Sequence, residues 1–233
     1  MRTLGLETSG GSGSVALVEN GQLVLEVAHQ ELNQHAERVL GLVEQALASA
    51  GWTKASLDRV AVSRGPGSFT ALRIGLALGQ GLALGLGIEA VGVCSLRALA
   101  ASALLDGPRL ARLPHDTRIV AIRDARRDEF FLACADAAGH LLHAPEALPR
   151  IAAAERIRSW CPSGQAPHRI VGSAFAVGTL ASELEWLERD DPRAACIALL
   201  GETLHPAIDP ALPEYVRGPN VVKPAMRPSP LRG

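Results

Sequence analysis

The chain is organised around the stretch Ser63-Arg64-Gly65-Pro66-Gly67-Ser68-Phe69-Thr70-Ala71-Leu72-Arg73-Ile74-Gly75. A β-type run, Val60–Val62, precedes it and a long apolar segment follows, so it predicts a junction of strand, glycine loop and helix. Such a junction directs backbone N–H groups and a helix N-terminus at one point, which suits an anion. We expect Ser68 to be the N-cap of the helix. The same pattern also fits a tight turn that binds nothing.

The candidate residues for a phosphate or nucleotide seat in this loop are Arg64, Gly65, Gly67, Ser68 and Thr70. A Walker-type phosphate loop requires Lys followed by Ser or Thr after its last glycine, and none is present here. The dinucleotide fingerprint requires a third small residue that Thr70 does not supply. Both common nucleotide-binding motifs are therefore absent from the loop.

Composition limits the classes of protein that remain. The 233 residues are 48% hydrophobic but only 3% aromatic, which indicates cores of Leu, Val and Ala. With a net charge of −1, the chain lacks the large basic excess of a self-sufficient nucleic-acid binder. No signal-peptide pattern begins the sequence, and the apolar segment Ile74–Ile88 is short for a bilayer and contains Gln80. We expect a cytoplasmic protein without membrane contact. Four widely spaced cysteines predict free thiols rather than a zinc site: Cys94, Cys134, Cys161 and Cys196.

The first part of the chain predicts three strands, a helix, a strand, a helix and a strand. Asn20-Gly21 is a strong hairpin signal between the second and third strands. The expected strands are Arg2–Glu7, Ser14–Glu19, Gln22–Ala28, Asp58–Ser63 and Glu89–Val93. The expected helices are Asn33–Ala50 and Phe69–Leu86.

A similar order begins again further on, after a helix over about Leu96–Leu105. The expected elements are a strand at Arg118–Ile122, a turn at Arg123–Arg127, and strands at Asp128–Ala135 and His140–Ala144. Helices alternating with one strand follow over Glu146–Trp160, His168–Gly172, Phe175–Glu188 and Pro192–Leu204. We interpret this as a diverged duplication, with domains at 1–106 and 107–205 and a proline-rich, extended tail at 206–233. Each domain should be an α/β unit with a mixed five-stranded sheet and flanking helices, as in the duplicated RNase H-like fold of actin, Hsp70 and the sugar kinases.

The helix after the glycine loop has two pairs of glycines four residues apart, Gly75 with Gly79 and Gly81 with Gly85. Each interior glycine costs about 0.5–1 kcal/mol relative to alanine, which suggests that another backbone passes close by. That backbone belongs either to the sheet beneath the helix or to a partner protein.

The chain resembles the TsaB (YeaZ) family of tRNA threonylcarbamoyladenosine biosynthesis proteins. The resemblance rests on motifs that span nearly the whole chain: Arg64–Gly75, Gly81–Gly85, Val91–Leu96, Ala121–Phe130 with its Asp124-Ala-Arg126, and Pro213–Arg217. The family usually has Asp where Glu7 stands and Gly where Ala71 stands, and the first difference weakens any transfer of the superfamily's phosphate chemistry to this turn.

The resemblance implies an accessory subunit without catalytic residues of its own. The family supports TsaD, together with the ATPase TsaE, in transferring a threonylcarbamoyl group to the N6 of the adenosine next to the anticodon in tRNAs that read codons beginning with A. TsaB pairs its first-domain helices with those of TsaD, so tRNA would be met only through the complex. The same face offers a homodimer contact when TsaD is absent, and ATP or ADP would bind at most weakly, at the partner interface. The expected interface residues are His35, Val39, Val43, Arg73, Ala77, Gln80, Gly81 and Leu84.

Two enzymatic alternatives remain open. The first is a weakly active ATPase or phosphotransferase that uses the Thr8–Ser14 turn and the Arg64–Thr70 loop. The second is a metallopeptidase, since the family was once grouped with glycoproteases. TsaD-like chemistry requires two histidines four residues apart on a helix, but Val39 stands four residues after His35. We expect no metal site, and we expect Glu7, Asp124 and Asp128 to be solvated turn carboxylates.

Basic residues gather at Arg109, Arg112, Arg118, Arg123, Arg126 and Arg127. They fit a solvated, salt-bridged face or an auxiliary contact to tRNA. No aromatic residues alternate with them, so they form no stacking platform for unpaired bases.

Overall fold

The computed structural model describes residues 1–29, 35–111, 113–162, 168–172 and 184–216. Its first half contains β1 (Arg2–Glu7), β2 (Gly13–Glu19), β3 (Gln22–His29), α1 (His35–Ala50), a 3-10 turn (Lys54–Ser56), β4 (Arg59–Gly65), α2 (Phe69–Leu86), β5 (Glu89–Cys94) and α3 (Ser95–Ala101). Its second half contains β6 (Leu105–Asp106), β7 (Arg109–Leu110), β8 (Ile119–Arg126), β9 (Glu129–Ala135), β10 (Glu146–Pro149), α4 (Arg150–Trp160), β11 (Arg169–Gly172), β12 (Glu185–Glu188) and α6 (Ala194–Gly201).

Two five-stranded sheets repeat one topology. The first has the strand order β3-β2-β1-β4-β5, and the second has β10-β9-β8-β11-β12. In each sheet the first three strands in chain order are antiparallel neighbours, and the last two join in parallel. The predicted duplication and the mixed five-stranded sheets are thus confirmed.

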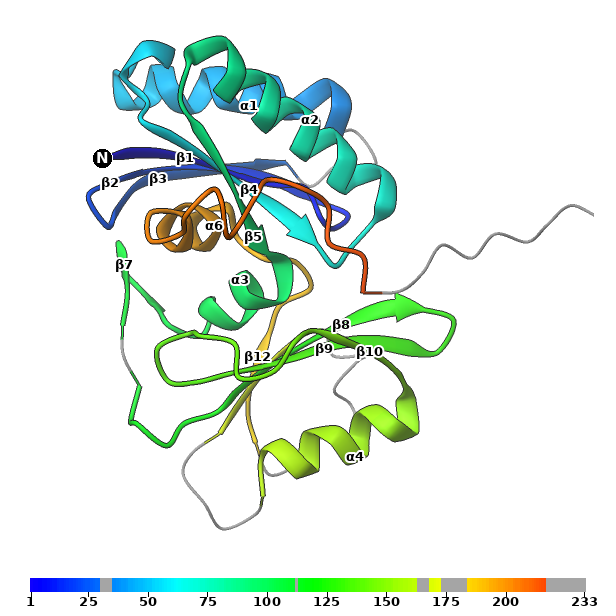
Figure 1. The fold of residues 1–233 in the computed structure, drawn as a ribbon. Coiled ribbons are helices and arrows are strands. Elements are labelled where there is room, and N and C mark those ends of the chain that lie inside the picture. Colours follow the sequence, from blue (N-terminus) through cyan, green and yellow to red (C-terminus); the bar gives the residue numbers. More distant parts are fainter. Residues whose placement is uncertain (30–34, 112, 163–167, 173–183, 217–233) are drawn as a thin grey trace, which may run out of the picture.

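Helices and sheets alternate in layers (Figure 1). Helices α1 and α2 cover the outer face of the first sheet, and α4 covers the outer face of the second. Between the sheets lie α3, against β8 and β9, and α6, against β1 and β2. Every residue of α6 is buried, as its composition of Ala, Cys, Ile and Leu requires for a helix enclosed on all sides. Helix α6 therefore packs on the first sheet although it follows the second sheet in sequence.

Several boundaries predicted for the second unit are wrong. Its third strand is β10, not His140–Ala144, where only an isolated bridge joins Leu141 to Ala135. Asp136 accepts hydrogen bonds from the backbone of Ala138 and His140 at 2.9 Å each, which holds the turn and delays the return strand. Helix α4 accordingly begins at Arg150 instead of Glu146.

The predicted turn at Arg123–Arg127 is also misplaced, because β8 continues to Arg126. The loop is Arg127-Asp128, and Arg126, Arg127 and Asp128 all have positive φ, at 66°, 60° and 61°. Non-glycine residues seldom adopt this conformation, so composition gave no signal for it.

The predicted helix at Phe175–Glu188 is wrong at its end, where Glu185–Glu188 forms strand β12. The rest of that prediction, over residues 175–183, lies outside the described residues. Asn33 and Arg112 lie outside them too. The tail predicted to be extended packs on the first sheet as far as it is described. Its backbone meets β5, where Gly92 N–H donates to the Asp209 carbonyl at 2.9 Å.

Candidate functional site

The glycine loop between β4 and α2 is occupied by the chain's own backbone. Ser68 N–H donates to the Ser9 carbonyl at 2.8 Å, and Gly65 N–H donates to Ser95 Oγ at 3.2 Å. A Cβ at Gly67 would overlap the Ser9 backbone, so the glycine is needed for this approach. Ser68 occupies the N-cap position of α2, but its hydroxyl makes no capping hydrogen bond, and the predicted cap interaction is wrong.

Two candidate phosphate ligands of the loop, Arg64 and Gly65, instead hold the C-terminal segment. Arg64 Nε pairs with Glu214 Oε2 at 3.2 Å, and its carbonyl accepts from Glu214 N–H at 2.7 Å. A Cβ at Gly65 would overlap the Glu214 carbonyl oxygen. Ser68 and Thr70 are exposed. A carboxylate and two carbonyl oxygens thus face the loop, and this arrangement does not suit a phosphate.

The Thr8–Ser14 turn of the first sheet is hydrogen-bonded to Arg123 of the second sheet and to Asp191. Arg123, on β8, donates to Ser9 Oγ at 2.8 Å, to the Pro66 carbonyl at 3.2 Å and to Asp191 Oδ1 at 2.8 Å. Asp191 Oδ2 accepts in turn from the Ser12 hydroxyl at 2.9 Å. Arg123 was predicted to lie in a solvated basic face, but its side chain is buried here. We call Ser9, Ser12, Arg123 and Asp191 the inter-sheet clamp.

Glu7 lies beside the clamp and is not the solvated carboxylate that the sequence predicted. It is buried at the end of β1, where Oε1 accepts from Ser9 N–H and Oε2 has no hydrogen-bond partner among the described residues. Burial raises the pKa of the Glu7 carboxyl to about 7, against the opposing effect of the Arg123 guanidinium. Asp124 and Asp128 are exposed, as expected.

The expected partner-interface residues separate into two groups. Val39 and Val43 are fully buried in the core of the first unit, so their assignment to the surface of α1 is wrong. They alternate with exposed residues of α1 because they form its core-facing stripe. The others on α2 are exposed and follow one face of the helix: Arg73, Ala77, Gln80, Gly81 and Leu84. The side chain of His35 lies outside the described residues.

The α2 glycines also separate into two kinds. A Cβ at Gly75 would overlap Thr8 Oγ1, and one at Gly79 would overlap Val62 on β4, so both allow the helix to approach its own sheet. A Cβ at Gly81 or Gly85 would meet no atom of the described residues within 4 Å. The sequence left open whether these glycines let α2 approach its own sheet or a partner protein. Close packing on the sheet accounts for Gly75 and Gly79, but not for Gly81 and Gly85.

The described residues contain neither a cluster of metal-binding side chains nor a thiol with a lowered pKa. No group of three or more His, Cys, Asp or Glu side chains lies there that could hold a metal ion. Burial raises the pKa values of the four thiols to about 11 or 12, which keeps them protonated: Cys94, Cys134, Cys161 and Cys196. All four cysteines are free, as predicted.

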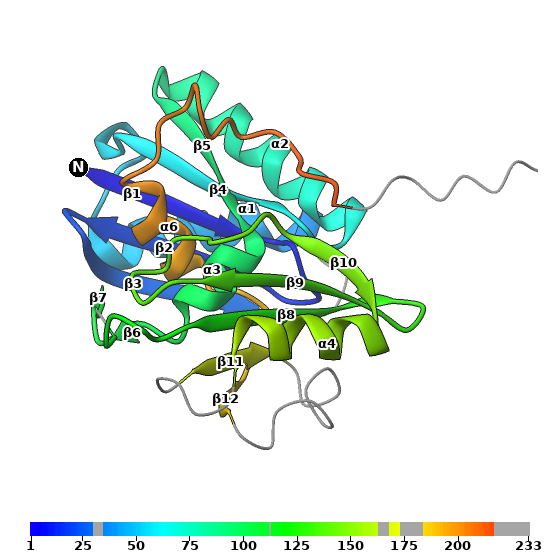
Figure 2. The same ribbon diagram turned by 60° about the horizontal axis from the view of Figure 1, so that its bottom comes forward.

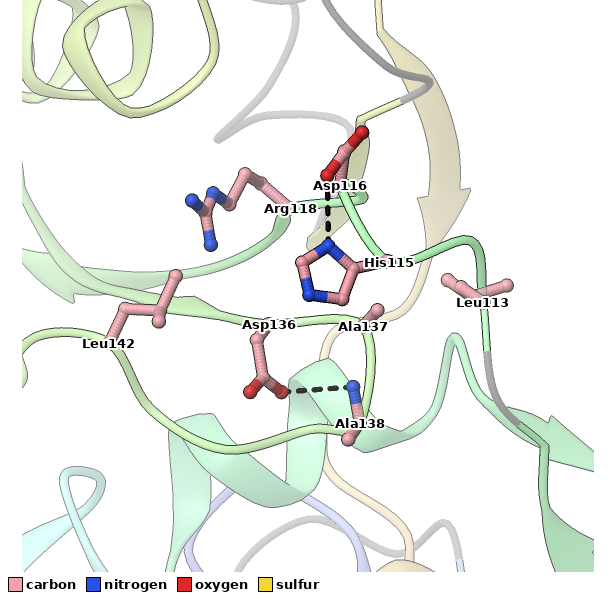
Figure 3. A pocket seen from close by; sticks show the side chains of 8 residues that line it. All are labelled: Leu113, His115, Asp116, Arg118, Asp136, Ala137, Ala138 and Leu142. Atoms are coloured by element: carbon pink, nitrogen blue, oxygen red, sulfur yellow. Dashed lines mark hydrogen bonds and ion pairs between the residues drawn. The ribbon is translucent and has the colours of Figure 1, made fainter.

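A cavity of about 500 Å³ opens beside the second sheet (Figure 3). Its lining comes from the segment before β8, including His115 and Arg118, and from the turn after β9, including Asp136. Burial alone would raise the pKa of Asp136, but hydrogen bonds from His140 and Ala138 lower it below its ordinary value. The carboxylate holds its turn. Arg118, one of the basic residues considered above for a contact to tRNA, lines this cavity, whereas the loop and partner-interface candidates do not.

Sequence reasoning missed Asp191, Phe69 and Tyr215. Tyr215 stacks on Phe69 with ring centroids 5.5 Å apart, and the Arg73 guanidinium lies 3.8 Å from the centroid of Phe69. Two signals were available: Phe69 and Tyr215 lie in motifs that carried the family resemblance, and Tyr215 is the chain's single tyrosine.

The repeated sheets with helices between and outside them define the duplicated actin-like, RNase H-like class of α/β proteins. EutJ from Carboxydothermus hydrogenoformans shares this fold with a TM-score of 0.53 at 15% identity over 86% of this chain and 90% of its own. Helix α2 is long and apolar enough to cross a membrane by length and composition, yet here it covers the first sheet.

Closer relatives narrow the class. The family model described as TsaD, tRNA N6-adenosine threonylcarbamoyltransferase, matches residues 8–162. The Escherichia coli K12 protein named tRNA threonylcarbamoyladenosine biosynthesis protein TsaB is 37% identical over 135 residues, which cover 57% of this chain and 54% of that protein. YeaZ from Pseudomonas aeruginosa superposes with a TM-score of 0.75 at 28% identity, over 92% of this chain and 99% of its own.

This chain belongs to the TsaB/YeaZ family, within the larger group that the TsaD family model describes. It spans about half the length of the curated TsaB proteins that it matches.

Proposed function

We propose that this chain is a non-catalytic accessory subunit for threonylcarbamoyl transfer to the N6 of the adenosine beside the anticodon, in tRNAs that read codons beginning with A. It acts by pairing the outer surface of α1 and α2 with TsaD and works together with TsaE. Contact with tRNA occurs through the complex. The proposed site of action is the cytoplasm.

The observation that carries the proposal is the exposed face of α2. Leu84 is 86% exposed, and Arg73, Ala77 and Gly81 continue the same helical face. Gly81 and Gly85 cost stability in an isolated helix, and nothing in the packing of the described residues requires them. Small residues on an exposed helix face allow the backbone of a partner helix to approach closely, and this explains why glycine stands there.

The alternative is a weakly active ATPase or phosphotransferase. Against it, the clamp fills the turn that would hold phosphates, and Glu7 beside it is buried, with no hydrogen-bond partner for its Oε2 among the described residues. Calorimetric titration of the isolated chain with ATP and Mg²⁺ tests this alternative. Saturable binding accompanied by turnover would favour an enzyme, whereas weak binding seen only with TsaD present fits a nucleotide at the partner interface.

Reconstituted transfer tests the proposal directly. Threonylcarbamoyl incorporation into tRNA is measured with TsaD, TsaE, the adenylate donor and ATP, with and without this chain, and with this chain alone. We expect product only when the chain joins the others. Product from this chain alone, or full activity without it, would overturn the accessory role.

A single substitution tests the face. Gly81→Leu adds a side chain where no atom of the described chain lies within 4 Å, so the fold should tolerate it, while a partner helix would be held away. We expect TsaD binding to fall at least tenfold with an unchanged or raised melting temperature. Size-exclusion chromatography of the variant without TsaD also shows whether a homodimer uses the same face.

A further inference from the structure

The segment 206–216, here called the strap, fixes itself along the edge of the first sheet. Val91 of β5 forms an antiparallel bridge with Pro210, and Gly92 N–H donates to the Asp209 carbonyl at 2.9 Å. Gln80 of α2 donates from Nε2 to the Ala211 carbonyl at 2.6 Å. Figure 2 shows the strap running beside α2. It therefore covers an edge strand that would otherwise present unpaired backbone groups.

Two glycines of the sequence motifs serve as docking points for the strap. A Cβ at Gly92 would overlap the Pro210 carbonyl oxygen, and one at Gly65 would overlap that of Glu214. The Arg64–Glu214 ion pair and the hydrogen bond from Glu214 N–H to the Arg64 carbonyl fasten the strap at the glycine loop. The loop, the Val91–Leu96 motif and the described residues of the Pro213–Arg217 motif thus form one structural unit.

The fastened strap builds an aromatic cluster at the start of α2. Tyr215 stacks on Phe69, and Arg73 lies over the Phe69 ring while its Nε donates to Tyr215 Oη at 3.3 Å. Phe69 remains 50% exposed and Tyr215 47% exposed. Exposed, preorganised Phe, Tyr and Arg side chains are typical of the residues that dominate binding energy in protein interfaces.

The aromatic cluster is continuous with the α2 face. Arg73 belongs to both, and Leu212 of the strap, 56% exposed, adds an apolar side chain next to the segment that Gln80 holds. Among the described residues, Arg73 has no carboxylate partner. The surface formed by the aromatic cluster, Leu212 and the α2 face is therefore mainly apolar, and a partner would have to supply a negative charge for Arg73.

We propose that the strap is a built part of the surface that docks TsaD, and that Tyr215, Phe69 and Arg73 are anchors of that contact. This inference rests on the proposed function. The partner segment facing them should carry an apolar side chain for the Tyr215 ring and a carboxylate for Arg73. The glycine loop then acts as the seat of the strap, and the strap extends the docking surface beyond the two helices.

Isothermal titration of the full chain with TsaD tests this, with Tyr215→Ala as the main variant and Ile151→Ala as the matched control. Ile151 is 76% exposed on α4, across the molecule from α2. We expect Tyr215→Ala to weaken affinity about tenfold or more, and Ile151→Ala to bind as the parent does. Gly92→Ala, which displaces the strap without removing any side chain of the cluster, should weaken binding at least as much.

Leu84→Lys separates the two proposals. If Leu84→Lys loses binding while Tyr215→Ala and Gly92→Ala bind normally, the strap inference is overturned and the helix face stands. If all of these variants bind TsaD as tightly as the parent chain does, both proposals fail. They fail likewise if the parent chain does not bind TsaD. A Tyr215→Ala variant that keeps its TsaD affinity but loses self-association, or loses binding to tRNA alone, would assign the strap to a second copy or to RNA and overturn the inference.

Discussion

Arg123 and Asp191, 68 residues apart in sequence, meet between the two sheets with 2.8 Å from Nη2 to Oδ1. Arg123 extends from β8 of the second sheet, and Asp191 precedes α6, which packs on the first. Through Ser9 and Ser12 the same pair holds the turn after β1. In this fold the pair ties the repeated units together across the turn where a nucleotide's phosphates would otherwise be sought.

Removing the clamp should destabilise the protein. Arg123→Ala removes the cation that pairs with Asp191 and leaves Ser9 Oγ and the Pro66 carbonyl without this donor in a buried setting, and we expect a loss of about 2–4 kcal/mol in the free energy of unfolding. Urea unfolding measures it. Lys54→Ala, which breaks the exposed pair with Glu44, serves as the control and should cost at most about 1 kcal/mol. If both substitutions lowered the free energy of unfolding equally, the stabilising role of the clamp would be contradicted.

Stability should depend on pH through Glu7. Its folded pKa of about 7 lies above the ordinary 4.5, so the folded state holds the proton more tightly than the unfolded state does. The stabilisation is fully present below pH 4.5 and is lost as pH rises toward 7, by about 3 kcal/mol in total.

Glu7→Gln carries no titrating proton and should lose this dependence. Unfolding in urea at pH 5 and pH 8 compares the two proteins, and the variant should gain on the parent as pH rises. Parallel pH profiles would mean that Glu7 is ionised with an ordinary pKa.

Two glycines of α2 should respond in opposite directions to alanine. Gly79→Ala places a methyl group into Val62 and should lower the melting temperature. Gly81→Ala meets no atom of the described residues within 4 Å and should stabilise the isolated chain by about 0.5–1 kcal/mol through helix propensity. Thermal unfolding of both variants, without partner, decides it; a destabilised Gly81→Ala would show that Gly81 has a packing role within the chain.

The hairpin between β8 and β9 should be improved by ordinary turn residues. Arg127 and Asp128 occupy positions with φ of 60° and 61°, which favour Asn-Gly in a two-residue hairpin loop. The double variant Arg127→Asn, Asp128→Gly should gain about 1 kcal/mol, less the small contribution of the exposed Asp128–Arg150 pair. The Arg127→Asn single variant isolates the turn effect, and a loss of stability in both would contradict it.

Local patterns were sufficient for most of the elements. Asn20-Gly21 forms the predicted hairpin turn with φ of 49° and 74°, and the helix at Phe69–Leu86 has the predicted bounds. The second unit was harder, because the β8–β9 turn places Arg and Asp at positive φ without a glycine to mark the position, and because Asp136 holds a longer turn than the pattern suggested. Burial of Val39 and Val43 was visible in the same periodicity that defined the helix, yet the resemblance assigned them to the surface.

The sequence by itself determined the succession of elements in the first unit, the duplication, the free thiols and the family, since these follow from short-range periodicity, spacing and motifs. Tertiary structure alone decided the state of Glu7, the position of Arg123 and the seat of the strap. The physical reason is that burial and hydrogen bonding depend on which distant segments meet: Ser9 with Arg123, Gly65 with Glu214, and Phe69 with Tyr215. No local pattern records those meetings, because each side chain's charge, exposure and pairing is set by neighbours brought together only when the two sheets close on α3 and α6.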